Sequence, residues 1–328
     1  MSLLSPDDIV GVVGILPTPS KPGSDSWQAT ETVDLEETAR MTEAVVAAGV
    51  DVILTNGTFG ECASLTWDEV QAFNETVVQT VAHRVPVFAG ATTLNTRDTI
   101  ARGFRLREIG ADGLFLGRPM WIALDDRGIV QYYRDVAEAL PDMSLVLYDN
   151  PSAFKGKISA AAYHELAKIP QVVASKHTGL ASGTAIADLH AVSGAIRLLP
   201  TDEGWYYMAR LFPEEVKACW SGNVACGPAP LVALKRAIAS REWDEAASIT
   251  RDLEWAHETF FPRGGFEEFS KYNIQLDRAK FEGAAFIQPG PARPPYTHAP
   301  QEYLEGARET GRRWAQLQAK YTAQVAAR

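Results

Sequence analysis

Residues 144–177 read SLVLYDNPSAFKGKISAAAYHELAKIPQVVASKH. Two short apolar runs, SLVLYDN from Ser144 and VVASKH from Val172, flank a segment of helical period that begins after the capping residue Ser159. Nearly continuous apolar runs are typical of parallel strands that are buried on both faces. The stretch therefore predicts a strand, a helix and a second strand parallel to the first.

The same unit recurs along the chain. Further strands are expected in GVVGILPTP from Gly11, DVILTNG from Asp51, VPVFAGA from Val85, DGLFLG from Asp112, IRLLPT from Ile196 and VKACWSG from Val216. Helices are expected at residues 35–48, 67–82, 95–109, 129–140, 159–168 and 182–191, with caps at Thr66 and Asn95 and end glycines at Gly49 and Gly110. Eight such units predict an α/β protein, a (β/α)8 TIM barrel. An open doubly wound sheet is the alternative, disfavoured because no GxGxxG or GxxxxGK[ST] follows the first strand.

The strand pattern stops after Pro228. Residues 1–230 are therefore expected to form the barrel and its catalytic region, and residues 231–328 a helical C-terminal extension packed on the barrel. The helical pattern there breaks at residues 261–265 and in a proline-rich stretch at 289–300. No low-complexity linker separates the two parts, so we expect a single structural unit.

The composition excludes several classes of function. The 328 residues are 46% hydrophobic and carry a formal charge of −10, which disfavours nucleic-acid binding. No apolar run approaches the roughly 18–20 residues of a membrane span, and the N-terminus does not resemble a signal peptide, so a cytoplasmic protein is expected. Three scattered cysteines and six histidines form no CxxC, HxH or HExxH pattern. We therefore expect no disulfide framework, no metal site and no bound cofactor.

Lys176 ends the strand VVASK, in which Val172, Ala174 and Lys176 share one face. If that face lines the barrel, burial disfavours the charged amine and lowers its pKa, which gives a nucleophile for carbonyl carbon. Tyr148 ends the neighbouring strand, and a phenol beside an amine suits proton transfer in Schiff-base chemistry. The alternatives are a strand-end lysine that reaches solvent or pairs with Glu61, and a tyrosine that only packs.

A third strand end carries Gly57-Thr58-Phe59-Gly60-Glu61. The two glycines permit a tight turn in which the Thr58 and Phe59 amides and the Thr58 hydroxyl converge. Three uncharged donors suit a small carboxylate or a phosphate. The alternative is a purely structural turn.

GTFGE at Gly57, YDNP at Tyr148 and SKHTG at Ser175 resemble, in order and spacing, three motifs of the N-acetylneuraminate lyase/dihydrodipicolinate synthase family of class I aldolases. The resemblance covers about residues 10–230. It implies a Schiff base between Lys176 and a 2-oxo acid, a proton relay through Tyr148, a pyruvyl carboxylate held by Thr58 and the Phe59 amide, and a homotetramer. Gly57 and Asn150 in these motifs, and Asn223 after the eighth predicted strand, are the other substrate-binding candidates.

The positions at which this sequence departs from the family pattern indicate the class of substrate. Ala153 stands where dihydrodipicolinate synthases carry an arginine for a second carboxylate, His177 replaces the acid after the lysine, and Phe59 replaces a hydroxyl residue. Aromatic residues near the entrance are Phe59, Trp121 and one of Trp27 or Trp205. This pattern is most similar to the hydratase-aldolases of aromatic hydrocarbon degradation, which implies cleavage of an arylidenepyruvate such as o-hydroxy- or o-carboxybenzylidenepyruvate, with Trp121 against the aryl ring.

Three alternatives stay open. A related lyase could act on a 2-keto-3-deoxy sugar acid, with Asp202 and Glu203 binding hydroxyls. The segment from Ser221 to Gly227 could bind phosphate, as loops after the eighth strand do in some barrels. A non-catalytic barrel could merely bind a 2-oxo acid. Arg118, Lys155 and Lys157, near predicted loops, could pair with an ortho carboxylate of the substrate, but we expect each to be a solvated surface charge.

Overall fold

The computed structural model describes residues 3–177 and 183–326. The chain divides into two compact units. The first unit contains residues 1–13, 51–55 and 85–221, and the second contains residues 14–50, 56–84 and 222–328.

The strands belong to the first unit, apart from the last two residues of β1. Their order in the sheet is β7-β6-β5-β4-β3-β2-β1-β8, and a parallel bridge between Thr201 and Trp220 joins the two ends of this series. The strands are β1 (Gly11–Ile15), β2 (Val52–Leu54), β3 (Val87–Gly90), β4 (Gly113–Leu116), β5 (Ser144–Tyr148), β6 (Val172–Lys176), β7 (Arg197–Leu199) and β8 (Ala218–Ser221). All eight predicted strands are present, and the predicted (β/α)8 barrel with C-terminal helices is confirmed.

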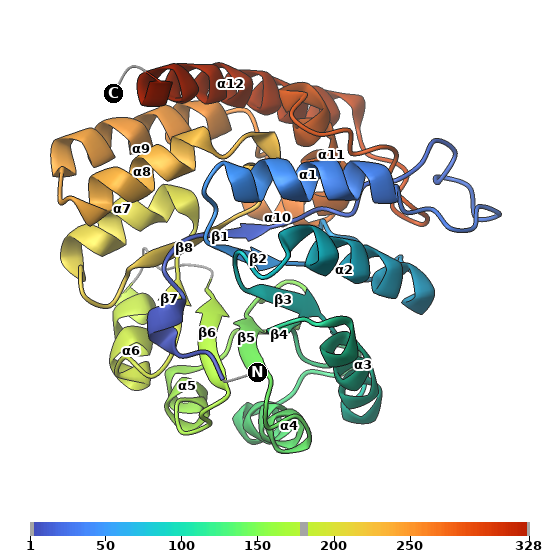
Figure 1. Ribbon diagram of the computed structural model, residues 1–328, viewed down its shortest axis with the longest axis vertical. Coiled ribbons are helices and arrows are strands. Elements are labelled where there is room, and N and C mark those ends of the chain that lie inside the picture. Colours follow the sequence, from blue (N-terminus) through green and yellow to red (C-terminus); the bar gives the residue numbers. More distant parts are fainter. Residues whose placement is uncertain (1–2, 178–182, 327–328) are drawn as a thin grey trace. The chain divides into compact units, whose positions relative to one another are not determined.

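Helices α3 to α6 lie outside the strands in Figure 1. The helices of the first unit are α3 (Thr96–Ile109), α4 (Asp126–Ala139), α5 (Ala160–Leu166), α6 (Gly183–Val192) and α7 (Asp202–Leu211). Asn95 and Ser159 accept the capping hydrogen bonds that the sequence predicts. Helix α4 begins before the expected residue 129 because Asp125 supplies an earlier cap. Helix α7, which Thr201 caps, was not expected.

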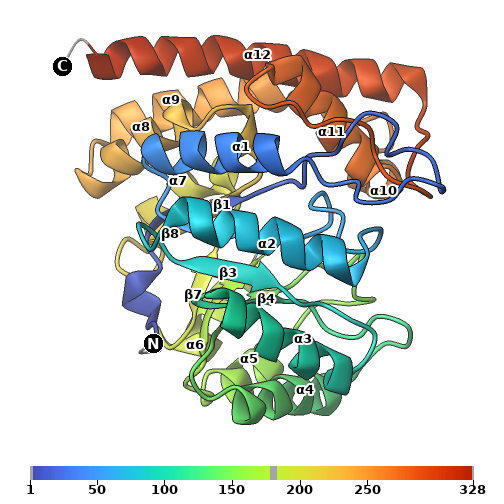
Figure 2. The ribbon, with the colours of Figure 1, turned by 45° about the vertical axis from the view of Figure 1, so that its right-hand side comes forward.

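The second unit consists mainly of helices. They are α1 (Leu35–Ala47), α2 (Trp67–Val81), α8 (Ala229–Ala239), α9 (Trp243–His257), α10 (Gly265–Ser270), α11 (Asn273–Ala284) and α12 (Gln301–Ala326). Helices α11 and α12 lie side by side (Figure 2). They approach closely because Gly283 and Gly311 have no Cβ, which at either position would overlap the backbone of the facing helix. None of the helices in residues 3–177 and 183–326 has the length and apolar character of a membrane span.

Candidate active site

Strands β5 and β6 place Tyr148 directly opposite Lys176. The pairing begins with Leu145 opposite Val172, and an irregularity then brings Val146 opposite Ala174. In an unbroken register Tyr148 would face Ser175, whose side chain points to the other side of the sheet. The bulge therefore puts the phenol and the amine on one face, as the alternation in the sequence predicts.

The Lys176 amine is enclosed by aromatic rings. The residue is 5% exposed, and its Nζ lies 5.0 Å from the ring centroid of Tyr148 and 3.4 Å from that of Trp220. The Trp220 indole N–H donates to the carbonyl of His177 (3.1 Å), which fixes the ring over the end of β6. Sequence reasoning missed Trp220, although it lies in the predicted strand from Val216, because we considered only the polar residues after that strand.

The Tyr148 hydroxyl has a polar neighbour from its own strand end. The Asn150 side-chain amide donates to the phenol oxygen through Nδ2 (3.3 Å). Its Oδ1 accepts from the backbone amides of Ser152 and Ala153 (3.1 and 3.2 Å). Asn150 is thus oriented by its own turn. The ring of Tyr148 stacks on Phe115, with centroids 4.6 Å apart. The structure therefore brings together Lys176, Tyr148 and Asn150 from the predicted set.

A buried polar layer lies on the opposite face of the same strand ends. The Tyr163 hydroxyl of α5 lies 3.2 Å from Asp149 Oδ2 and 2.8 Å from Ser175 Oγ. Asp149 directly follows Tyr148 and Ser175 directly precedes Lys176, so this one hydroxyl connects the ends of both strands. Burial and the Asp149 carboxylate raise the pKa of Tyr163 well above its usual value, which keeps the hydroxyl protonated.

Two charged side chains that we expected in solvent take part in this layer. Arg118 is buried and forms an ion pair with Asp149 (3.4 Å), so the expectation of a surface charge was wrong. Lys157, expected in solvent as well, instead forms an ion pair with Asp188, a buried residue of α6. Lys155, in contrast, is exposed and donates to the Trp121 carbonyl (2.7 Å).

His177, which replaces the family's acid, is buried and points to α6, where its Nε2 lies 2.8 Å from Asp188 Oδ2. Thr178 and Gly179 of the SKHTG motif lie outside the described residues.

In the second unit, the segment Gly57-Thr58-Phe59-Gly60-Glu61 forms a tight turn. The Glu61 amide donates to the Thr58 carbonyl (3.0 Å) and the Cys62 amide to that of Gly57 (3.3 Å). A Cβ on Gly60 would lie 2.9 Å from the Asn56 Cα, so the turn requires glycine there. The tight turn that we expected from Gly57 and Gly60 is present.

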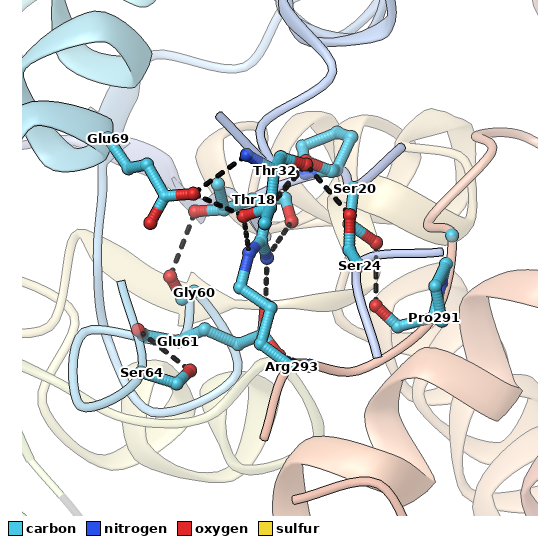
Figure 3. Close-up of polar contacts among 12 residues, drawn as sticks. Thr18, Ser20, Ser24, Thr32, Gly60, Glu61, Ser64, Glu69, Pro291 and Arg293 are labelled. Atoms are coloured by element: carbon cyan, nitrogen blue, oxygen red, sulfur yellow. Dashed lines mark hydrogen bonds and ion pairs between the residues drawn. The ribbon is translucent and has the colours of Figure 1, made fainter. Parts of the chain in front are cut away.

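The Phe59 side chain is buried, with its ring edge-on to Phe281 of α11 (centroids 5.9 Å apart). It anchors the turn to the helices of its own unit, whereas Thr58 remains partly exposed. The carboxylate of Glu61, which we considered as a partner for Lys176, accepts instead from Arg278 and Arg293 (Figure 3).

The remaining candidates lie in varied surroundings. Asn223 is buried in the 3-10 turn Asn223–Cys226, where its side-chain amide donates to His257 Nε2 (3.1 Å). The indole of Trp121 is 76% exposed and that of Trp27 is 83% exposed. Trp205 is buried, and its N–H points to the carbonyl of Val216 (3.4 Å), so it belongs to the core.

Comparison with known proteins decides the family. A model of the dihydrodipicolinate synthetase family matches residues 20–193. The chain is 58% identical to trans-2'-carboxybenzalpyruvate hydratase-aldolase of Nocardioides sp. (strain KP7), covering 97% of each protein. It is 46% identical to trans-o-hydroxybenzylidenepyruvate hydratase-aldolase of Pseudomonas aeruginosa, covering 98% of this chain and 96% of the relative. The chain belongs to the dihydrodipicolinate synthetase family.

Solved structures agree with this membership. PhdJ bound to a substrate intermediate superposes with a TM-score of 0.96 at 62% identity, covering 98% of this chain and 100% of that one. Dihydrodipicolinate synthase of Aquifex aeolicus, at 24% identity, shares the fold with a TM-score of 0.80, covering 93% of this chain and 98% of that one. Members of the family are class I aldolases that work through a lysine Schiff base, and this chain is an enzyme of that type.

Proposed function

We propose that the protein is a hydratase-aldolase that cleaves an arylidenepyruvate into an aromatic aldehyde and pyruvate, as a step in aromatic hydrocarbon degradation. The observation that carries the proposal is the Lys176–Tyr148 pair: an amine almost excluded from solvent, facing a phenol across two paired strands. The names of the relatives at 58% and 46% identity support the substrate class.

The proposed reaction uses the residues in order. The Lys176 amine condenses with the 2-oxo carbon and releases water, and the resulting iminium draws electrons from the conjugated double bond, so that a water molecule adds to it. Loss of one proton from the added water leaves an enamine, and Tyr148 donates its own proton to the carbon next to the former 2-oxo carbon, which restores the iminium. The Tyr148 phenolate then takes the proton of the new hydroxyl while the carbon–carbon bond breaks, which releases the aldehyde and leaves the enamine of pyruvate on Lys176. Protonation and hydrolysis of this enamine return pyruvate and the free amine.

The other candidates have binding roles in this proposal. Thr58 and the Phe59 amide, in the turn that begins at Gly57, hold the pyruvyl carboxylate. Asn150 keeps the Tyr148 hydroxyl in place, Asn223 borders the substrate, and Trp121 contacts the aryl ring. The reaction needs no metal ion, because the iminium itself is the electron sink.

Reduction with borohydride in the presence of pyruvate tests the proposal. We expect inactivation and one 1-carboxyethyl group, located by peptide mapping on Lys176. Lys280 is a matched control, because it too is buried and lies 4.3 Å from an aromatic ring centroid, that of Phe260. A label on Lys280, or full activity in a Lys176→Ala variant, would overturn the Schiff-base assignment.

The second candidate function is cleavage of a 2-keto-3-deoxy sugar acid. Asp202, which we considered as a ligand for sugar hydroxyls, is buried and accepts from the Ser221 hydroxyl (2.5 Å). This engagement favours the aromatic substrate. Pyruvate release from 2'-carboxybenzalpyruvate, o-hydroxybenzylidenepyruvate and a deoxy sugar acid, compared side by side, separates the candidates.

We also propose that the enzyme is a cytoplasmic homotetramer, in which residues 231–328 form an extension of the barrel in 1–230 and not an independent domain. The family resemblance supports the tetramer, and light scattering of the purified protein tests it.

A further inference from the structure

We propose that Arg293 and Arg278, from the C-terminal part of the chain, are positioning residues for the turn at Gly57–Phe59. By binding the Glu61 carboxylate they hold the amides of this turn in the conformation that receives the substrate carboxylate. The inference rests on the proposed function, in which that turn binds the pyruvyl group.

Glu61 is fully buried and both of its oxygens are bound by arginine. Oε1 accepts from the backbone amide of Arg293 (2.9 Å), and Oε2 accepts from Arg293 Nη1 and from Arg278 Nη2 (2.5 Å). The two arginines are 217 and 232 residues away in the sequence. Charge-assisted bonds of this kind, excluded from water, are among the strongest that a side chain makes.

Each arginine also binds the long loop between β1 and α1. Arg293 donates through Nε to the Thr32 hydroxyl (2.5 Å) and through Nη2 to the Pro19 carbonyl (3.2 Å), and Arg278 donates to the Thr18 carbonyl (2.8 Å). Figure 3 shows Arg293 between Glu61 and Thr32. The guanidinium groups therefore connect three segments: residues 17–34, the turn with Glu61, and residues 278–293.

The backbone of the turn needs such support. Glu61 has a φ of 58° and Asn56 a φ of 46°, which is the left-handed region that residues with a side chain rarely adopt. Conformations of this kind persist only where the surroundings fix them. Thr18 adds a bond to the turn itself by donating to the Gly60 carbonyl (2.8 Å). Because Thr58 and Phe59 lie in the chain between Asn56 and Glu61, their orientation follows that of the two residues that flank them.

A second carboxylate joins the cluster through Thr32. Glu69 accepts from the amide of Thr32 (2.8 Å) and from its hydroxyl, and the same hydroxyl accepts from Arg293 Nε (2.5 Å). Deleting one charge would leave the others buried and unpaired, which destabilises a protein strongly. The informative substitution is therefore Arg293→Lys, which keeps the charge but lacks the planar fork that reaches Glu61 and Thr32 together.

The experiment compares two carbonyl compounds that differ in the carboxylate. Labelling of Lys176 by borohydride is measured against the concentration of pyruvate and, separately, of acetone, which forms the same iminium without a carboxylate. In Arg293→Lys we expect the half-saturating pyruvate concentration to rise about 10-fold, the scale of one charge-assisted hydrogen bond. We expect labelling by acetone to be unchanged.

Arg40→Lys is the matched control. Arg40 also makes a bidentate ion pair with a glutamate, Glu37 (2.6 Å). It donates to the backbone carbonyl of Phe286, in the C-terminal part of the chain (2.8 Å), and not to Glu61. Its pyruvate dependence should equal that of the wild type. If Arg293→Lys does not fold, Arg278→Lys takes its place, with a smaller shift in the same direction.

The outcomes separate the two proposals. A wild type that pyruvate does not label would overturn the proposed function and, with it, this inference. A labelled wild type whose half-saturating pyruvate concentration is unchanged in the lysine variants would overturn the inference alone. An equal loss of labelling by pyruvate and acetone would also overturn it, because the arginines would then support the whole site and not the carboxylate turn.

Discussion

The Lys176 amine lies against the face of Trp220, 3.4 Å from the ring centroid, while the indole N–H of the same ring donates to the carbonyl of the next residue, His177. The contact joins the proposed nucleophile of β6 to β8. A face of π electrons attracts both an ammonium group and the iminium that replaces it.

Trp220→Leu should therefore lower kcat/KM by roughly 5- to 30-fold, because a cation–π contact contributes about 1–2 kcal/mol when it is shielded from water. Trp220→Phe keeps the ring and should lose less. Steady-state kinetics with an arylidenepyruvate checks both. If the leucine and phenylalanine variants are equally impaired, the effect comes from the hydrogen bond to His177 and not from the ring face.

Tyr148→Phe should lower kcat by about 10²–10⁴-fold, the usual range for a lost proton-transfer group, while pyruvate and borohydride still label Lys176. Single-turnover cleavage, together with trapping, measures the two steps apart. Tyr133→Phe is the control, since its buried hydroxyl donates to the Leu116 carbonyl (3.0 Å). A Tyr148→Phe enzyme with normal kcat would reduce Tyr148 to a packing residue.

Tyr163→Phe should lower kcat by about 10-fold, although Tyr163 does not contact the substrate in the proposed site. Its hydroxyl connects Asp149 with Ser175, and small displacements of reacting groups slow catalysis strongly. KM should change little. Tyr132→Phe, which also removes a buried hydroxyl but one that contacts Gly117 and Thr99, should leave kcat unchanged. Equal kcat values in the two variants would refute the positioning role.

Trp121→Ala should lose about 10- to 100-fold in kcat/KM for an arylidenepyruvate, through lost stacking and burial against the aryl ring. Condensation of pyruvate with a small aliphatic aldehyde should suffer much less. Trp27→Ala, which removes an equally exposed indole, is the control. Equal losses for both aldehydes in Trp121→Ala would remove Trp121 from the site.

Acid should weaken the fold partly through Asp188. Burial disfavours its carboxylate, but hydrogen bonds from His177 and Lys157 outweigh this effect and hold the pKa of Asp188 below its usual value of 3.8. A carboxyl group with a depressed pKa stabilises the folded state above its unfolded pKa, and this contribution is lost as the pH falls through the folded value. Urea unfolding of Asp188→Asn should show lower stability at pH 7 and a smaller loss below about pH 4 than the wild type. If the unfolding free energies of the two proteins fall equally between pH 7 and about pH 4, Asp188 does not contribute in this way.

Local patterns in the sequence predict the strands, the helix caps and the catalytic pair, because alternation and capping depend on neighbouring residues. Three features could not be predicted from such local patterns, because each depends on residues far apart in the sequence. The partners of Glu61 lie more than two hundred residues away. The position of Trp220 beside Lys176 depends on how the barrel closes. The sequence around Arg118 is that of an ordinary loop, and only the fold shows that Arg118 is buried and paired with the Asp149 carboxylate. The role of each site residue, Trp121 included, stays a prediction.

The irregular pairing of β5 with β6 has a consequence for anyone who wishes to redesign this enzyme. One extra residue in β6, Val173, sets which side of the sheet carries the amine. Deleting it, or transplanting a regular strand of the same composition, would leave hydrophobicity and length nearly unchanged yet turn the Lys176 side chain away from Tyr148. Loops at the rim tolerate insertion far better than this strand does. One extra residue in one of two neighbouring strands thus brings Lys176 and Tyr148 to the same face.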